Sequence, residues 1–186
     1  MRRKLQPLFL KHKLQHLIEF DRRPLIKERI TGFVLDFSRT LIFLHELEWN
    51  VFALNGYIVI RDDDVRRIRI FEASSSWQRK ALWQNKIKPR PVSGVCLDSL
   101  PALIASVSKK FPLINIQREK IEDGVCWIGR VLNMTDKTVT IEELDYHAKW
   151  VGKRRFKFTD ITRVEFGDGY TKALALSAEG LQKFKQ

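Results

Sequence analysis

The chain has 186 residues, a formal net charge of +12 at pH 7 and a hydrophobic content of 44%. This length and composition suit one large globular domain or two small ones, and they argue against a disordered chain. The positive charge favours an anionic partner such as nucleic acid, and the lack of any run of 18 apolar residues excludes a membrane-spanning helix.

The first predicted element is a helix over residues 7–20, PLFLKHKLQHLIEF, in which apolar residues recur at helical spacing. Short strands follow, rich in β-branched and aromatic residues: ITGFVLDF from Ile30, TLIFLHELE from Thr40, YIVIR from Tyr57 and VRRIRI from Val65. The segment SSSWQRKALWQNKI from Ser74 is compatible with another helix, and KPRPVSG from Lys88 is typical of a linker.

The second half repeats this order. DSLPALIASVSKKF predicts a helix that begins at an Asp98 or Ser99 cap and carries Pro101 in its first turn. Strands are then predicted for LINIQREK, VCWIGRVLNM, TVTIEELD, KRRFKF, ITRVEF and YTKALAL.

The two halves are similar at a nearly constant offset. Gly32 matches Gly129 and Glu46 matches Glu143 at an offset of 97, which becomes 96 after one loop, where Gly56 matches Gly152. A shared offset over some forty residues indicates a duplicated segment.

Duplication sets the predicted fold class, mainly β with flanking helices (α+β). Each half has about five short strands, too few to cover a large helix layer as a flat sheet, so we expect two tandem small bent five-stranded barrels. Each barrel is expected to follow a helix. The predicted domains are residues 1–90, which include the trailing helical segment, and residues 91–186.

Two short motifs carry a family resemblance. VIRDDDVRRI from Val59 resembles the second motif of the Sm and Sm-like family, in which an apolar residue and Arg precede Gly-x-Asn. Arg61 lies on the arginine of the motif, Asp62 on its glycine and Asp64 on its asparagine. In the second copy Lys157 lies on the arginine, and Gly32 and Gly129 resemble the glycine of the first motif.

The resemblance implies a bent barrel that binds RNA between the loop after the second strand and the loop before the fifth, usually in a ring. By position, Arg61 and Lys157 would contact phosphate or a base, and Arg39 and Lys137 would supply the neighbouring loop. The family's Asp-x-aromatic-Met-Asn loop is shortened here to SRT and TDKT. The alternative for Arg61 is an ion pair with the carboxylates that follow it.

A second basic surface is predicted in KWVGKRRFK. Its candidate nucleic-acid-binding residues are Lys149, Trp150, Lys153, Arg155 and Lys157. On a strand, the last three share one face, which would hold phosphates while Trp150 stacks on a base. The alternative is an edge strand protected from aggregation by its charge.

Catalysis is not predicted. The acidic segments HELE and EELD are accounted for by charged strand ends, phosphate-binding and dinucleotide glycine patterns are absent, and no cofactor or metal is expected. The less favoured alternative is a metal-dependent nuclease or hydrolase that uses Glu46, Glu48, Glu143 and Asp145.

The leading hypothesis is a cytoplasmic, non-enzymatic Sm-like protein that binds RNA or other single-stranded nucleic acid. The presence of only two cysteines and the interrupted apolar stretch near the N-terminus favour the cytoplasm. No membrane partner is expected, and exposed strand edges favour a homo-oligomer. The rival hypothesis is a protein-interaction module or scaffold that uses sheet edges and helices and binds no nucleic acid.

Overall fold

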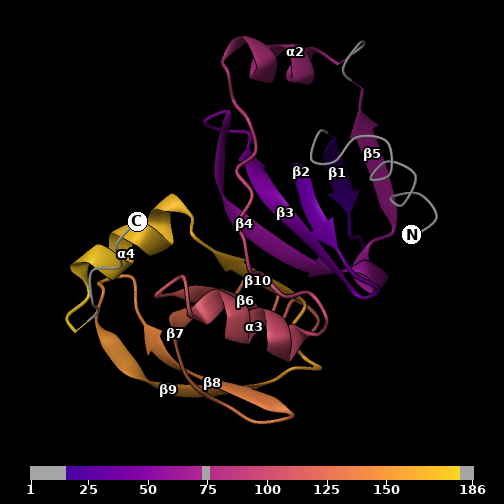
Figure 1. Cartoon of the computed structure of the whole chain (residues 1–186). Helices are drawn as coiled ribbons and strands as arrows, with labels where there is room; N and C mark the ends of the chain where they lie inside the picture. Colours follow the sequence, from indigo (N-terminus) through magenta and orange to yellow (C-terminus); the bar gives the residue numbers. More distant parts are fainter. Residues whose placement is uncertain (1–15, 73–75, 181–186) are drawn as a thin grey trace. The chain divides into compact units, whose positions relative to one another are not determined.

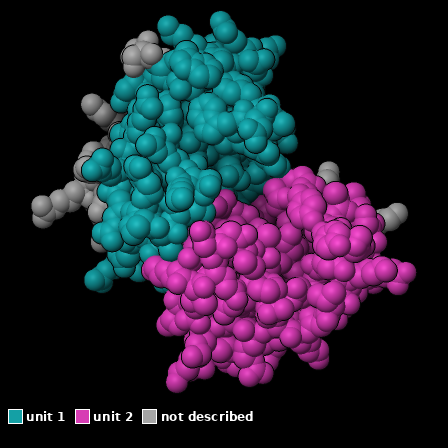
Figure 2. Space-filling model, turned by 180° about the vertical axis from the view of Figure 1, so that it is seen from behind, with its two compact units in different colours: residues 1–93 teal, residues 94–186 magenta. Residues whose placement is uncertain are grey.

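A computed structural model describes residues 16–72 and 76–180 of the chain. The chain divides into two compact units, residues 1–93 and 94–186, which are coloured separately in Figure 2. The N-terminal basic segments MRRK and KHK lie outside the described residues.

The described residues of unit 1 form five antiparallel strands, a short 3-10 turn and one helix (Figure 1). They are β1 (Leu17–Asp21), β2 (Ile30–Phe37), β3 (Leu41–Glu48), β4 (Ala53–Arg61), η1 (Asp62–Asp64), β5 (Arg67–Phe71) and α2 (Trp77–Gln84). Within the unit the strand order is β5-β1-β2-β3-β4.

Unit 2 has the same order of strands, β10-β6-β7-β8-β9, and two described helices. The elements are α3 (Leu100–Ser108), β6 (Ile114–Gln117), β7 (Cys126–Met134), β8 (Thr138–Leu144), β9 (Trp150–Lys157), β10 (Arg163–Phe166) and α4 (Gly169–Ser177).

The prediction of two closed barrels, each preceded by a helix, is wrong. The strands form an open antiparallel arrangement, because the fifth strand of each unit pairs with the first and the described pairings within a unit do not join the fifth to the fourth. Among the described residues, the helices that follow the fifth strands are α2 and α4, and only unit 2 has a helix, α3, ahead of its strands. The alternation of polar and apolar residues identifies strands, but it does not say whether the row of strands closes.

The helix predicted over residues 7–20 is also wrong where it can be compared. Leu17 begins β1, and residues 1–15 lie outside the described part of the chain. Leu17 packs on one face of the sheet with Phe33 and Phe71, while Ile18 and Phe20 belong to a separate cluster on the other face. A strand buried on both faces gives a continuous apolar run, which is easily read as one side of a helix.

The segment YTKALAL, predicted as a strand, is the helix α4. Its N-cap is Asp168, whose Oδ1 accepts a hydrogen bond of 2.8 Å from the Thr171 backbone N–H. Thr171, Leu174 and Ala178 are buried on one side of it, at helical spacing.

The helices predicted around Trp77 and Pro101 are confirmed. Ser76 caps α2 and Ser99 caps α3, each through a side-chain oxygen that accepts from the backbone three residues later.

Equivalent contacts recur in the two units. Gly32 lies opposite Glu46 and Gly129 lies opposite Glu143, and each second strand has an irregularity in pairing shortly after its glycine. A Cβ atom on Gly32 would lie 2.5 Å from the His45 carbonyl oxygen, and one on Gly129 would lie 2.2 Å from that of Glu142. Both glycines are therefore needed for close approach to the third strand.

In each unit, the helix after the fifth strand packs on one face of the sheet. Leu82 of α2 joins a buried cluster with Leu17, Phe33, Leu47 and Phe71. In unit 2, Leu174 and Ala178 pack with Leu113, Ile128 and Leu144. In unit 2 the exposed side chains of Lys153, Arg155 and Lys157 on β9 lie on the same face of the sheet, beyond this cluster.

Candidate nucleic-acid interface

Two loops of unit 2 are joined by a backbone hydrogen bond. The Phe158 N–H donates to the Lys137 carbonyl oxygen at 3.0 Å, which holds the loop between β7 and β8 against the end of β9. The side chains of Lys137 and Lys157 are both exposed. The structure thus places Lys137, in the β7–β8 loop, next to the end of β9, where Lys157 is the last residue.

The β7–β8 loop is fixed by a hydroxyl. Thr135 Oγ1 accepts hydrogen bonds from the backbone N–H groups of Lys137 at 3.2 Å and Thr138 at 3.0 Å. Side-chain bonds of this type stabilise tight turns. The position of Lys137 therefore depends on Thr135.

The three predicted cations of β9 alternate along the strand. Lys153, Arg155 and Lys157 are exposed, while Phe156 between them is buried on the opposite face. Alternate residues of a strand lie about 6.7 Å apart. No ion pair within the described ranges involves any of the three. They form a row of cations, which we call the β9 cation row.

Unlike the residues of the β9 cation row, the neighbouring arginines form ion pairs with glutamates. Arg130 binds the Glu142 carboxylate at 2.6 Å, and its guanidinium lies 4.5 Å from the centre of the Trp150 ring. Glu142 is opposite Lys153 across the strands, so the nearest carboxylate to Lys153 on β8 is already held by Arg130.

Arg154 is also engaged. It binds Glu143 at 2.7 Å, and its guanidinium lies 3.6 Å from the centre of the Trp127 ring. Trp127 in turn donates to Glu122 Oε2, which also accepts from Arg118. These two hydrogen bonds lower the pKa of Glu122 from its ordinary value, with that from Arg118 the larger cause.

The other two predicted residues of this segment, Lys149 and Trp150, do not belong to the β9 cation row. Lys149 is exposed in the turn before β9, where its backbone N–H donates to Asp145 at 2.8 Å. Trp150 is partly buried against the α4 cluster, and its indole N–H donates to the Glu179 carbonyl oxygen at 2.9 Å. With Arg130 over its ring, Trp150 acts mainly as a packing residue.

Unit 1 has the equivalent loops with a different charge. The Asp62 N–H donates to the Thr40 carbonyl oxygen at 2.9 Å, so the β2–β3 loop with Arg39 lies next to the end of β4, where Arg61 is the last residue. Arg61 is only partly exposed and is followed directly by the three aspartates of η1. These carboxylates would repel phosphate, so unit 1 is the poorer candidate for an anion.

The acidic residues of HELE and EELD have structural partners. Glu48 accepts from the Asn55 amide at 2.6 Å, Glu143 binds Arg154, and Asp145 accepts from two backbone N–H groups of its own turn. His45 Nδ1 accepts from the Arg90 N–H at 3.0 Å and its ring stacks on Tyr57. In residues 16–72 and 76–180, no group of three His, Cys, Asp or Glu side chains is arranged to hold a metal ion.

A buried ionic group lies at β10. Burial raises the pKa of Glu165, against the effect of Arg163 beside it, and Asn115 donates to its Oε2 at 2.7 Å. Its carboxylate is enclosed by its partners, which fits a structural role.

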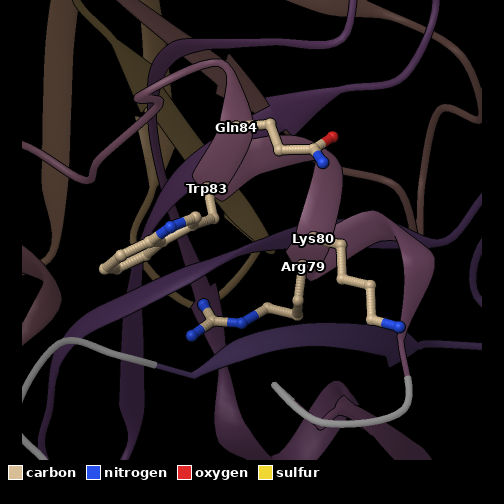
Figure 3. Close-up of a pocket in the computed structure, with 4 residues that line it drawn as sticks. All are labelled: Arg79, Lys80, Trp83 and Gln84. Carbon is tan, nitrogen blue, oxygen red and sulfur yellow. The ribbon is translucent and has the colours of Figure 1, made fainter.

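The sequence prediction did not include the surface of α2. A cavity of about 290 Å³ is lined by Arg79, Lys80, Trp83 and Gln84 of this helix (Figure 3). The segment WQRKALWQNKIK combines aromatic and basic residues, which could have indicated a binding surface. Aromatic residues also serve to pack a helix on a sheet, so the pattern alone does not distinguish the two roles.

No known family model, curated protein or solved structure matches the chain. Among the helices of the described part, none is long and apolar enough to cross a membrane.

Proposed function

We propose that the chain is a non-catalytic protein that binds single-stranded nucleic acid, in particular RNA, along the β9 cation row. The observation that carries this proposal is the contrast on one sheet between these three unpaired cations and the paired Arg130 and Arg154. Arginine and lysine side chains that lack a carboxylate partner are the groups that phosphates attract.

The spacing of the cations supports an extended ligand. Side chains about 6.7 Å apart along a strand suit the repeating phosphates of a single strand that runs parallel to β9. Lys137 adds a further exposed cation on the adjacent β7–β8 loop. Protection of an edge strand explains charge on β9 itself, but it does not explain a further cation from another loop.

The choice of RNA rests on the resemblance to the Sm and Sm-like family, which we propose as a relationship. Its support is the pair of close-packed glycines and the positions of Arg61 and Lys157 beside the preceding loop in each unit. A cytoplasmic location is part of the same proposal, since Cys96 and Cys126 are free thiols.

The test is binding of a fluorescently labelled single-stranded RNA to the whole chain, measured by anisotropy at several salt concentrations. We expect tight binding at about 50 mM salt that weakens steeply by about 200 mM, as counterion release requires. A lack of binding at the lowest salt concentration would overturn the proposal.

A protein-interaction module is the second candidate. β9 is the last strand in the order of unit 2, so one side of its backbone is free to pair with an added strand, and Val151 is exposed beside it. The basic side chains would favour an acidic partner and would disfavour pairing of two β9 edges in a homo-oligomer. Capture of a partner that survives both nuclease and high salt would favour this function.

A further inference from the structure

The outer surface of α2 combines a fixed helix with an exposed aromatic ring. Leu82 is 2% exposed and anchors the helix in the apolar cluster of unit 1, while the adjacent Trp83 is 80% exposed. The backbone at Trp83 is therefore anchored through its neighbour, while the Trp83 ring lies outside the core.

The second tryptophan of the helix differs. Trp77 stacks on Phe52 with ring centres 6.1 Å apart and planes 15° apart, and it also lies near Trp49. Trp83 has no ring contact with any residue in the described part of the chain. Its flat faces remain available to a ligand.

Trp83 lies in a basic part of the sequence. Residues 77–90 contain five Lys and Arg and no Asp or Glu. In Figure 3 the Trp83 indole and the Arg79 guanidinium extend to the same side of α2, whereas Lys80 and Gln84 extend to the other. Arg79 is partly buried, with its guanidinium 5.4 Å from the centre of the Phe33 ring, so its charge is held beside the cavity. Burial lowers the pKa of Arg79, and Glu72 acts against that effect.

We infer that the cavity on α2 is a nucleotide subsite, in which a base stacks on Trp83 and the adjacent phosphate binds Arg79 on the same side of the helix. This inference rests on the proposed function and adds a second contact point for the same ligand. An exposed aromatic face beside cations is the arrangement by which proteins hold splayed bases of single strands.

The small volume of the cavity and its exposed indole favour a nucleotide over an acidic peptide. Its volume of about 290 Å³ lies just below the roughly 300–1,000 Å³ typical of ligand pockets, which suits one base rather than a bulky group. An acidic peptide would use the cations but would leave the indole face exposed.

The experiment compares Trp83→Ala with Leu176→Ala, a truncation of another exposed apolar residue, 81% exposed, in α4. Binding of a labelled oligouridylate to the whole chain is measured at several salt concentrations. Trp83→Ala should weaken binding about tenfold and leave the salt slope unchanged, since the indole carries no charge, and Leu176→Ala should match the wild type. Trp83→Phe should lie between Trp83→Ala and the wild type.

A photo-crosslink gives an independent readout. A 5-bromouridine oligonucleotide irradiated on the wild-type chain should form an adduct that maps to Trp83. Wild-type affinity of Trp83→Ala with no adduct at Trp83 would overturn this inference while leaving the β9 proposal in place. Failure of the wild type to bind the oligonucleotide would overturn both, and Trp83-dependent binding of polyglutamate alone would assign the cavity to an acidic peptide instead.

Discussion

Lys137 and Phe158 are joined across two loops by a backbone hydrogen bond of 3.0 Å, and the bond of 2.9 Å between Thr40 and Asp62 takes the same place in unit 1. Because backbone groups form both bonds, the two units make the same bond with different residues. On this framework unit 2 has Lys137 and Lys157, with Asp136 and Asp160 in the same two loops, whereas unit 1 has three consecutive aspartates directly after Arg61. The charge of these loops, rather than their backbone geometry, therefore distinguishes the two units.

The close-packed glycines predict equal sensitivity in both units. Gly32→Ala and Gly129→Ala should each lower the free energy of unfolding by about 1–3 kcal/mol, because the added methyl group would meet a backbone carbonyl that has little room to move. Chemical denaturation measures both. If one substitution were harmless and the other severe, the two halves would not be equivalent.

At Thr135, in the turn that positions Lys137, we expect an alanine substitution to be harmful and a serine substitution to be tolerated. Thr135→Ala removes the acceptor of two backbone N–H groups and should cost about 1 kcal/mol of stability and weaken RNA binding modestly. Thr135→Ser should restore both properties, since Ser38 accepts the equivalent hydrogen bonds in unit 1. A serine variant as weak as the alanine variant would show that the methyl group, and not the hydroxyl, matters.

The lowered pKa of Glu122 implies that the stability of the fold depends on pH. Its pKa is lowered in the folded state, so its contribution is complete above the ordinary value of 4.5 and is lost as the pH falls through the folded value. The stability advantage of the wild type over Glu122→Gln, measured by urea denaturation, should therefore be largest near neutral pH and shrink below 4.5. An advantage that grew on acidification would contradict this assignment.

The repeat was the part of the fold that the sequence revealed best. The matched positions of Gly32 and Gly129 place both glycines opposite a glutamate of the third strand, with the register that the offset predicts. Open and closed rows of strands have the same alternation of polar and apolar residues, so the barrels were predicted wrongly.

Two elements were misread for opposite reasons. β1 is buried on both faces, and its continuous apolar residues resemble a helix. In α4, the exposed Leu176 lies two residues after the buried Leu174, and the apparent alternation in YTKALAL imitates a strand.

The sequence predicted the positions of the β9 cations better than the surroundings of Trp150. Alternation on β9 was enough to place Lys153, Arg155 and Lys157 on one face. Trp150 was predicted to stack on a base, but the Arg130 guanidinium that lies over its ring comes from another strand. Contacts between distant strands depend on register, which the local pattern does not contain.

The most direct test of the account is the salt dependence of RNA binding in two variants with the same loss of charge. One neutralises the β9 cation row with Lys153→Gln, Arg155→Gln and Lys157→Gln; the other is the control with Lys109→Gln, Lys110→Gln and Lys172→Gln, all exposed in unit 2. The slope of log K against log salt should fall by about 2 in the first variant, at about 0.7 per phosphate contact, and stay at the wild-type value in the control. Equal losses in the two variants, or wild-type binding by the first, would contradict the account.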